Sequence, residues 1–421
     1  MRYARAPGHS TRLHEVAMLR VPVNMIEPGM VLARPIPVPS DPRRFLLQRD
    51  HEIPLDLVPR LRDLGIVEVW VRHRDLEFLE DLIDEGLSDC QREVYASVRS
   101  NFESIMQETT AQLDVGRFQS SIGGLFDYLK KTVHGNVLLH KLDAFDNYLM
   151  SHSANVGYLS LLLGMQLERY LIDERSAKSP RDAKDLTVLG VGCLLHDVGK
   201  MRIPSEVLNK PERLTDEEMA IVKQHPVYGY EMVKGRVPAS AAQIVLNHHQ
   251  RFNGEGYPPR VDPDTGELLP PLAGKQIPVF SRIATVVDIY DAATTARCYS
   301  GAKQPVQVLH EMRTWCEGFF DPVVADAFYR LVPPFPIGQV VGLSDGSEAA
   351  VVDFNPNRPT RPKLQGLKDP KGQRLEDPSL HEIDLALHLD LQITTVNGTD
   401  IRPYLASLET PILPETSYAL L

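Results

Sequence analysis

Histidines in the middle of the chain are the residues with the clearest potential for chemistry. Five of them fall on or at the end of segments with helical periodicity. They are His152, His196, His225, His248 and His249. Asp197 follows His196 directly, and Asp288 lies in the otherwise apolar segment IATVVDIYDAATTAR. Imidazole nitrogens and carboxylate oxygens are ligands that divalent transition metals accept. The pattern therefore indicates a metal site.

The spacing of these residues suggests which of them bind one metal ion and which bridge two. Adjacent residues on a helix point about 100° apart, so His196 and Asp197 cannot face the same way. The imidazole can bind one ion while the carboxylate bridges two, about 3.5–4 Å apart, which polarises a shared hydroxide. Asp291, one turn after Asp288, is placed to support a ligand from behind. A lone His-Asp pair is usually structural, but burying all these groups without a cation is costly. The other nine histidines lack such partners.

Elements of several kinds must position these residues. Residues 23–71 alternate short β-like runs with one helix-like stretch, which predicts a small α+β module. Helical periodicity follows, with breaks expected at Gly116 and at Gly123-Gly124, and it dominates residues 136–332. Pro333, Pro334 and Pro336 then mark a boundary. We expect a mainly α fold, with a helical bundle between the N-terminal module and a small β-rich C-terminal extension.

The expected domain organisation has four parts. Residues 1–90 form a leader with the small α+β module, 91–135 a helical connector, 136–332 the catalytic bundle and 333–421 the β-rich extension. Within the bundle, the helix of DLTVLGVGCLLHDVGK should stop at Gly199, and the residues from Thr215 to Glu218 should cap the helix that carries His225. A hairpin is expected around Asp345-Gly346, and LDLQITTVNG predicts another strand.

Composition limits the cellular context. The chain has 421 residues and a net charge of −11, so neither nucleic acid nor an anionic membrane is an expected partner. The four cysteines form no CxxC pair, which favours reduced thiols. No apolar run is long enough to cross a bilayer, and the basic N-terminus lacks the apolar part of a signal peptide. These features predict a cytoplasmic protein.

Several motifs in register make the pattern specific. HS at 152–153, LLHDVGKMRIP at 194–204, KPERLTDEEM at 210–219 and KQHPVYGYEM at 223–232 are followed by NHHQRFNGEGYP at 247–258. IPVFSRIATVVDIYDAATTARCY and FFDP complete the series, which covers nearly half of the chain. Together they resemble the HD-GYP family of metal-dependent phosphodiesterases in the HD phosphohydrolase superfamily.

The resemblance implies an activity and a ligand set. The family hydrolyses cyclic di-GMP to pGpG, and in some members to GMP, by attack of a metal-bridging hydroxide on phosphorus. Two divalent ions, iron or manganese, are implied. By matching positions, one ion would be held by His152, His196, Asp197 and Asp288. Asp197 would bridge to a second ion, whose remaining ligands would be His225, His248 and His249.

Substrate contacts are expected from residues around this centre. Lys200, one turn after His196-Asp197, is expected to place its ammonium on a phosphate or on the departing 3′ oxygen. Arg297 is expected to hold phosphate or guanine through its planar fork. Gly254 and Gly256 permit a tight loop, from which Tyr257 would stack on a base or cap the pocket. A purely structural tyrosine is the alternative.

The chain also departs from the family pattern. Tyr148 stands where some members have a glutamate that recruits a third metal, so two ions are expected here. The usual HHERxDG is HHQRFNG, with Gln250 and Asn253 in place of acids, and the basic residue usual near Arg297 is absent. The link at residues 259–276 is longer than usual. It would serve as a lid, as a partner-binding loop, or as an inert excursion.

Other functions stay open at this level. A second hypothesis is an HD phosphohydrolase for another cyclic dinucleotide or nucleotide. A third is a non-catalytic cyclic di-GMP receptor or scaffold, which would not need the full ligand set. An oxygen-activating HD protein fits the GYP segment least well. Signalling partners at the GYP loop and a homodimer are further candidates, and the terminal modules are where an input signal or a partner would act.

Overall fold

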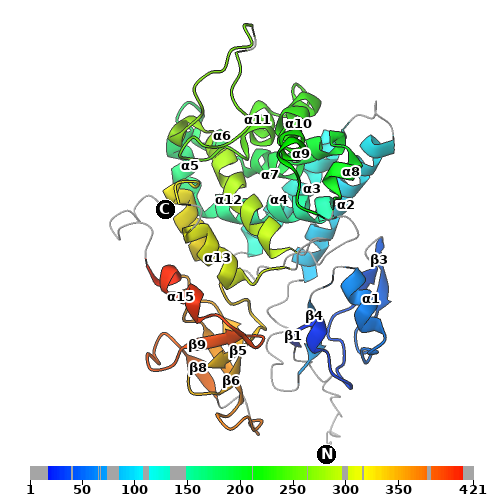
Figure 1. The fold of residues 1–421 in the computed structure, drawn as a ribbon, viewed down its shortest axis with the longest axis vertical. Coiled ribbons are helices and arrows are strands. Elements are labelled where there is room, and N and C mark those ends of the chain that lie inside the picture. Colours follow the sequence, from blue (N-terminus) through cyan, green and yellow to red (C-terminus); the bar gives the residue numbers. More distant parts are fainter. Residues whose placement is uncertain are drawn as a thin grey trace, which may run out of the picture.

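The computed structural model of the chain describes most of its length. The described residues are 18–38, 41–64, 66, 68–73, 85–107, 113–132, 148–210, 212–262, 264–295, 302–314, 317–376 and 381–410. Figure 1 shows a helical unit with two small β-containing modules beneath it, one from each end of the chain. This arrangement confirms the expected fold class. None of the described helices is both long and apolar enough to cross a membrane.

The N-terminal module contains two strand pairs and one helix. Strand β1 (Met18–Pro22) pairs with β4 (Glu68–Arg72), and β2 (Ile36–Val38) pairs with β3 (Asp41–Leu47), both antiparallel. Helix α1 (Leu57–Asp63) lies between β3 and β4 in the sequence. The backbone N–H of Arg20 donates to the carbonyl of Gly338 at 2.9 Å, which joins this module to the C-terminal one.

Two helices lead into the helical unit. They are α2 (Glu85–Gln107) and α3 (Val115–Thr132), which pack against each other. The break expected at Gly123-Gly124 is wrong, because both glycines lie inside α3. Phe118, Ile122 and Leu125 are buried along one face of α3, and this packing holds the helix together through the glycines.

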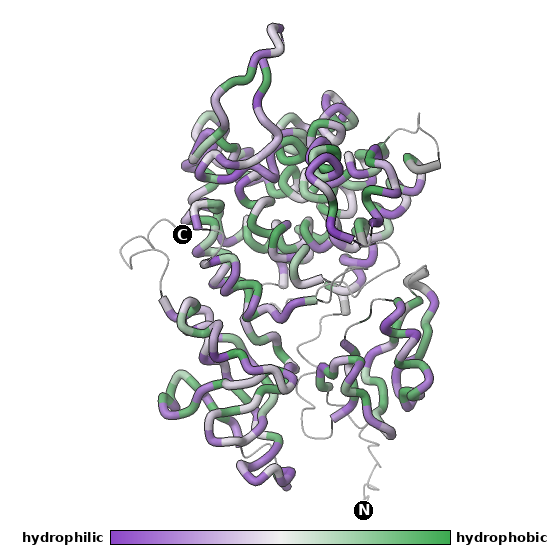
Figure 2. Tube along the Cα trace, in the orientation of Figure 1, coloured by the Kyte–Doolittle hydropathy of each residue, from purple (hydrophilic) through white to green (hydrophobic). Residues whose placement is uncertain are grey.

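The helical unit is built around α4 (Tyr148–Gln166), which packs against α2, α7, α12 and α14. Figure 2 shows apolar residues running through these central helices. The other helices of the unit follow α4 in the sequence. They are α5 (Glu168–Glu174), α6 (Pro180–Ala183), α7 (Leu186–Leu195), α8 (Ser205–Leu208), α9 (Asp216–Val222), α10 (His225–Val233), α11 (Ala239–Asn247), α12 (Val279–Thr294), α13 (Pro305–Thr314) and α14 (Pro322–Leu331).

Two helix boundaries differ from the sequence expectation. Helix α7 ends at Leu195, and a short 3-10 helix, η3 (Val198–Arg202), follows His196 and Asp197. The expected capping box is present, since Thr215 and Glu218 bond reciprocally, but it opens α9. His225 instead begins the next helix, α10, in which Pro226 occupies a first-turn position.

The C-terminal module is a six-stranded antiparallel sheet in the order β10-β9-β5-β6-β7-β8. The expected hairpin is present, because β5 (Val340–Leu343) and β6 (Glu348–Asp353) flank Asp345-Gly346. The expected later strand is β9 (Ile393–Val396). The other elements are β7 (Lys363–Lys368), β8 (Glu382–Asp384), β10 (Thr399–Asp400) and helix α15 (Arg402–Glu409).

The long link after Pro258 forms an excursion that projects from the helical unit at the top of Figure 1. An isolated antiparallel bridge joins Val261 to Leu268 across its two limbs. The carboxylate of Asp262 accepts the backbone N–H groups of Asp264 and Thr265 at 2.9 Å, which closes the turn. The Leu268 side chain at this end is 75% exposed.

Candidate metal centre

The seven residues expected to bind metal lie together in the interior of the helical unit. Their ligand atoms form two groups, each with atoms within 4.8 Å of one another. The first group is His152, His196 and Asp288, and the second is Asp197, His225, His248 and His249. This is the division that the family resemblance implied, with Asp197 assigned to the second group. Three of the seven residues lie in α4, α10 and α12, and the other four lie at the ends of α7 and α11 or in the turns that follow them.

Three of the histidines point their Nε2 atoms inward for a common backbone reason. Nδ1 of His196 donates to the carbonyl of Cys193 at 2.7 Å. Nδ1 of His225 donates to Val222 at 2.8 Å, and Nδ1 of His248 donates to Val245 at 3.0 Å. A carbonyl can only accept, so each Nδ1 carries the proton. The ring is thereby fixed with Nε2 as the free ligand atom.

His152 is oriented by a carboxylate instead. Its Nδ1 lies 2.8 Å from Oδ2 of Asp291, and its Nε2 lies 3.0 Å from Oδ1 of Asp288. His152 is on α4 and both aspartates are on α12, so this contact also fastens two central helices together. The supporting role expected for Asp291 remains a prediction, although the contact that it requires is present.

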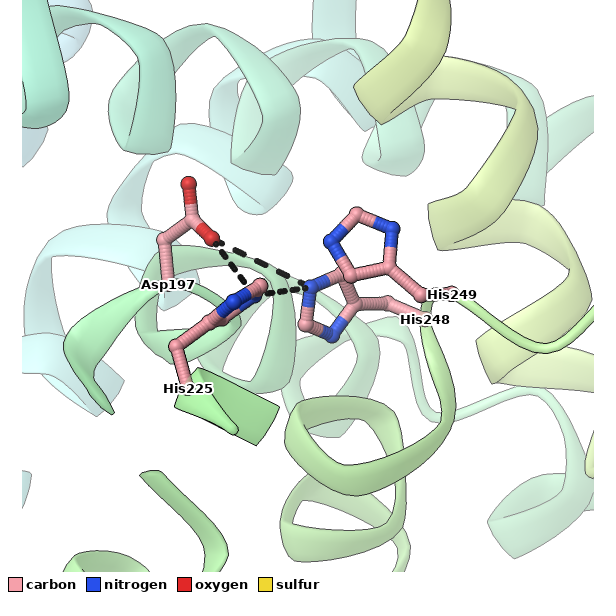
Figure 3. Close-up of side chains that lie close together, drawn as sticks. All are labelled: Asp197, His225, His248 and His249. Carbon is pink, nitrogen blue, oxygen red and sulfur yellow. Dashed lines mark hydrogen bonds and ion pairs between the residues drawn. The ribbon is translucent and has the colours of Figure 1, made fainter. Parts of the chain in front are cut away.

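Asp197 lies between the two groups. Its Oδ2 is 3.4 Å from Nε2 of His196, and its Oδ1 is 3.2 Å from Nε2 of His225. The same Oδ1 lies 3.9 Å from Nε2 of His248, as the dashed lines of Figure 3 indicate. Each oxygen thus faces a different group. This is the geometry that a bridging carboxylate needs.

A glycine makes this approach of elements possible. A Cβ at Gly199 would lie 1.9 Å from the carbonyl oxygen of His225 and 2.4 Å from the backbone nitrogen of Gly229. Any side chain there would push η3 away from α10, and with it Asp197 away from His225. Sequence reasoning did not single out Gly199 for this role. Its place two residues after Asp197 was the available signal.

The electrostatics of the first group are those of ion pairs. Burial disfavours a charged imidazole, but Asp197 and Asp288 outweigh it and raise the pKa of His196 to about 10. Burial likewise opposes the charge on His152, whose pKa is nevertheless raised by Asp288 and Asp291. For Asp288, burial favours the neutral acid, yet the hydrogen bond from His152 and the nearby charge of His196 hold its pKa well below the usual range.

The second group behaves differently. Burial, reinforced by His249, His196 and His225, holds the pKa of His248 well below its usual value. Burial also lowers the pKa of His249 to about 3 despite the neighbouring Asp288. These imidazoles are therefore neutral, with their lone pairs available to a cation.

The donor set tests directly whether a metal fits. Nε2 of His225 and Nε2 of His248 lie 3.2 Å apart. In each ring the Nδ1 proton is donated to a backbone carbonyl. A neutral ring therefore has a lone pair on Nε2, and the two Nε2 lone pairs would face each other. Nε2 of His196 and Oδ1 of Asp197 are fully buried without a hydrogen-bond partner among the described residues. A cation between these atoms would bind the two facing nitrogens and would also give the unpartnered atoms of His196 and Asp197 a partner. The residues therefore fit a divalent metal.

The expected substrate-side residues surround the opening of the centre. Lys200 forms an ion pair with Oδ2 of Asp197, and its side chain is 21% exposed. Tyr257 stacks on His249 with ring centroids 4.5 Å apart. A Cβ at Gly256 would lie 2.5 Å from the backbone nitrogen of Arg251, so only glycine fits this loop. Arg297 lies outside the described residues, as does the Tyr148 side chain.

Two contacts at this loop were not expected from the sequence. The Gln250 amide is buried and donates from Nε2 to the carbonyl of Pro258 at 2.7 Å. Lys223 lies over the Tyr257 ring, 5.6 Å from its centroid. The Gln250 contact was signalled only by the departure from the acid usual at this position. A carboxylate there would have no proton to donate.

Comparison with known proteins gives two domain matches. Residues 164–324 match the HD domain, and residues 340–400 match the KOW domain associated with the HD domain. The first match contains His196, Asp197, His225, His248, His249 and Asp288. The second match covers strands β5 to β10.

Several curated proteins are similar to this chain. Cyclic di-GMP phosphodiesterase PA4108 of Pseudomonas aeruginosa is 35% identical over 224 residues, 52% of this chain and 48% of that protein. Cyclic di-GMP phosphodiesterase response regulator RpfG of Xanthomonas campestris pv. campestris is 36% identical over 150 residues, 35% of this chain and 37% of that protein. 3′3′-cGAMP-specific phosphodiesterase 2 of Vibrio cholerae is 33% identical over 135 residues, 31% of this chain and 24% of that protein.

The matches cover only part of each relative, and this limits what they establish about the chain. The matched region spans about half of the first relative and smaller shares of the other two. The HD domain match, the motifs and the buried ligand set agree with one another. The chain therefore carries an HD domain, followed by the KOW domain that is associated with HD domains.

Proposed function

We propose that this protein is a metal-dependent phosphodiesterase that hydrolyses cyclic di-GMP to pGpG, or further to GMP. The observation that carries the proposal is the 3.2 Å separation of Nε2 of His225 from Nε2 of His248 beside Asp197, with Nδ1 of each ring bonded to a backbone carbonyl. Such an arrangement is unfavourable unless a cation lies there. Relatives with 33–36% identity are named as cyclic dinucleotide phosphodiesterases, which supports this substrate class.

The proposed centre holds two divalent ions, iron or manganese. His152, His196 and Asp288 would hold one, His225, His248 and His249 the other, and Asp197 would bridge them. When bound, such ions supply Lewis acidity toward water and phosphoryl oxygens. The nitrogen and oxygen donor set suits either metal and includes no thiolate.

The protein residues around the centre have separable tasks in this proposal. Hydrolysis joins a water oxygen to phosphorus and breaks the P–O3′ bond, so the 3′ oxygen must take up a proton. The Lys200 ammonium, held against Asp197 at the partly open edge of the site, offsets charge on the phosphate or on that oxygen. Tyr257, already stacked on His249, presents a ring to a base. Arg297 stays a phosphate or guanine contact predicted from the sequence.

The decisive experiment incubates iron-loaded and manganese-loaded protein with cyclic di-GMP under anaerobic conditions and resolves the products by chromatography. We expect pGpG, either alone or with GMP. Asp197→Ala should abolish product formation, whereas Asp173→Ala, which removes an exposed carboxylate on α5, should not change it. If neither metal form yields pGpG or GMP, the proposed activity is wrong.

A second candidate is hydrolysis of 3′3′-cGAMP, favoured by the similarity to a phosphodiesterase named for that substrate. Parallel reactions with the two cyclic dinucleotides at equal concentrations decide between them. A higher kcat/KM for cyclic di-GMP supports the first candidate. The reverse ranking assigns the protein to the second.

A further inference from the structure

A second pocket lies away from the metal centre, where the helical unit meets the C-terminal module. It is a cavity of about 300 Å³. Helices α13 and α14, the loop between β6 and β7, and the end of α15 form its walls. Its volume is at the lower end of the range for small-molecule sites.

The charge of this pocket is unusual for the chain. Arg313, Arg330, Arg358 and Arg361 line it. Among the described residues, two carboxylates, Asp326 and Glu409, line it with them, so these residues together carry a net charge of +2 in a protein of net charge −11. Clustered arginine forks are the arrangement that proteins use to bind phosphate.

Most of this positive charge has no acidic partner. Arg330 pairs with Asp326 at 2.8 Å. The other three arginines form no ion pair with the described residues and are anchored by backbone carbonyls. Nη1 of Arg358 donates to Ala386 at 3.2 Å. Nη1 of Arg361 donates to Leu385 and Leu391, both at 3.1 Å.

These anchors orient the guanidinium groups without neutralising them. A guanidinium has five N–H donors, and for both Arg358 and Arg361 only Nη1 is used among the described residues. Arg313 donates to the carbonyl of Thr410 and lies over the Tyr329 ring, 5.1 Å from its centroid. Burial lowers the pKa of Arg313, and the charges of Tyr329 and Asp326 offset this only in part. An anionic ligand would relieve this.

The rest of the lining indicates the remainder of the ligand. Beside the charged residues and the polar Asn357, Thr360 and Thr410, five apolar side chains line the walls. They are Leu309, Pro334, Pro356, Pro359 and Leu408. Such surfaces accept a compact ring or sugar better than a second charged group.

We propose that this pocket, between α13–α14 and the KOW domain, binds a small phosphorylated metabolite of about the size of a nucleoside monophosphate. The phosphate would lie on Arg358, Arg361 and Arg313, and the uncharged part against the proline-lined wall. The pocket draws on both domains, so an occupied pocket links the KOW domain to the last two helices of the helical unit. This proposal does not depend on the activity of the metal centre.

Isothermal titration of the full chain with inorganic phosphate, GMP and guanosine tests it. GMP should bind, phosphate more weakly, and guanosine at least about tenfold more weakly than GMP, because a charged hydrogen bond to phosphate is lost. Arg358→Gln and Arg361→Gln should each weaken GMP binding about tenfold. Arg402→Gln, which alters an exposed arginine paired with Asp400 outside the pocket, should stay within about twofold of wild type.

Two further measurements keep the outcome clear. Thermal melting checks that each variant is folded, and Arg358→Lys should recover part of the affinity because it keeps the charge. Asp197→Ala must retain the GMP binding that Arg358→Gln and Arg361→Gln weaken, since the metal centre is a separate site. The proposal is overturned if wild type binds neither phosphate nor GMP at millimolar concentration, or binds guanosine equally well. It is equally overturned if the Arg358 and Arg361 variants bind like wild type, or if binding disappears in Asp197→Ala.

Discussion

Two buried polar clusters involve residues of α12, and they differ in whether the protein itself supplies partners for their polar atoms. One is the metal centre around Asp288, and the other surrounds Arg282, less than two turns earlier on the same helix. Arg282 is 4% exposed, and its guanidinium donates to the carboxylates of Glu174 and Asp321. It also donates to the Tyr170 hydroxyl and to the carbonyl of Ile277, both at 2.9 Å.

The difference lies in where the compensating charge comes from. In the Arg282 cluster every guanidinium nitrogen has a protein acceptor, and the Tyr170 hydroxyl donates to Asp321 at 2.7 Å. In the metal centre, Nε2 of His196 and Oδ1 of Asp197 lack hydrogen-bond partners among the described residues. A closed network stabilises the fold by itself. An open one is built to accept an ion.

The largest expected effect comes from removing the carboxylate that faces both groups. Asp197→Ala should lower kcat by on the order of 10³-fold or more, because groups that act as a unit fail together. Metal analysis should show loss of at least one ion per chain, while the melting temperature stays close to that of metal-free wild type. Unchanged metal content would contradict the bridging role.

Removing the central charge of the Arg282 cluster, whose polar groups are paired within the protein, should lower the stability of the fold instead. Arg282→Met takes the guanidinium away from the buried Asp321 and from Glu174, which keeps Lys275, and this should cost about 3–5 kcal/mol of unfolding free energy. Denaturant unfolding measures this. Arg236→Met, at an exposed position before α11, should change stability by less than about 0.5 kcal/mol. A stable Arg282→Met protein that has lost its metal would reverse the comparison.

A smaller effect is expected at the loop beside the metal centre. Gln250→Glu removes the amide proton donated to Pro258 and sets a carboxylate against a carbonyl oxygen, at a cost of about 1–3 kcal/mol. We expect a higher KM with bound metal unchanged. Gln250→Asn should keep a donor and lose less. If Gln250→Glu has wild-type kinetics and stability, this contact does not position the loop.

The smallest expected effect is the loss, at acidic pH, of the stability that Glu174 contributes in the Arg282 cluster. Burial favours a neutral Glu174, but hydrogen bonds from Lys275 and Arg282 lower its pKa overall. A lowered pKa in the folded state adds stability above the unfolded value, about 4.3, and this stability is lost as the pH falls through the folded pKa. The melting difference between wild type and Glu174→Gln should therefore shrink below about pH 4. A difference that grows in acid would contradict the lowered pKa.

The sequence determined the identities of the candidate ligands. Residue types, the HDVGK and HHQRFNGEGYP motifs and helical periodicity were sufficient to select the seven side chains, because ligand chemistry limits which residues can serve. The mainly α fold and the C-terminal hairpin followed from periodicity and turn residues. Helix ends were less predictable. The ends of α7 and α9 depend on where His196 and the η3–α10 contact fit, which local propensity does not encode.

Tertiary structure alone decided how the ligands are divided and oriented. That Asp197 faces both groups depends on the approach of η3 to α10 across Gly199. That Nε2 is the free atom of three histidines depends on backbone carbonyls at the ends of their own turns. The closed cluster of Arg282 and the arginine pocket beside the KOW domain join residues more than 30 positions apart. Such contacts are set by packing, for which a single sequence carries no local signal.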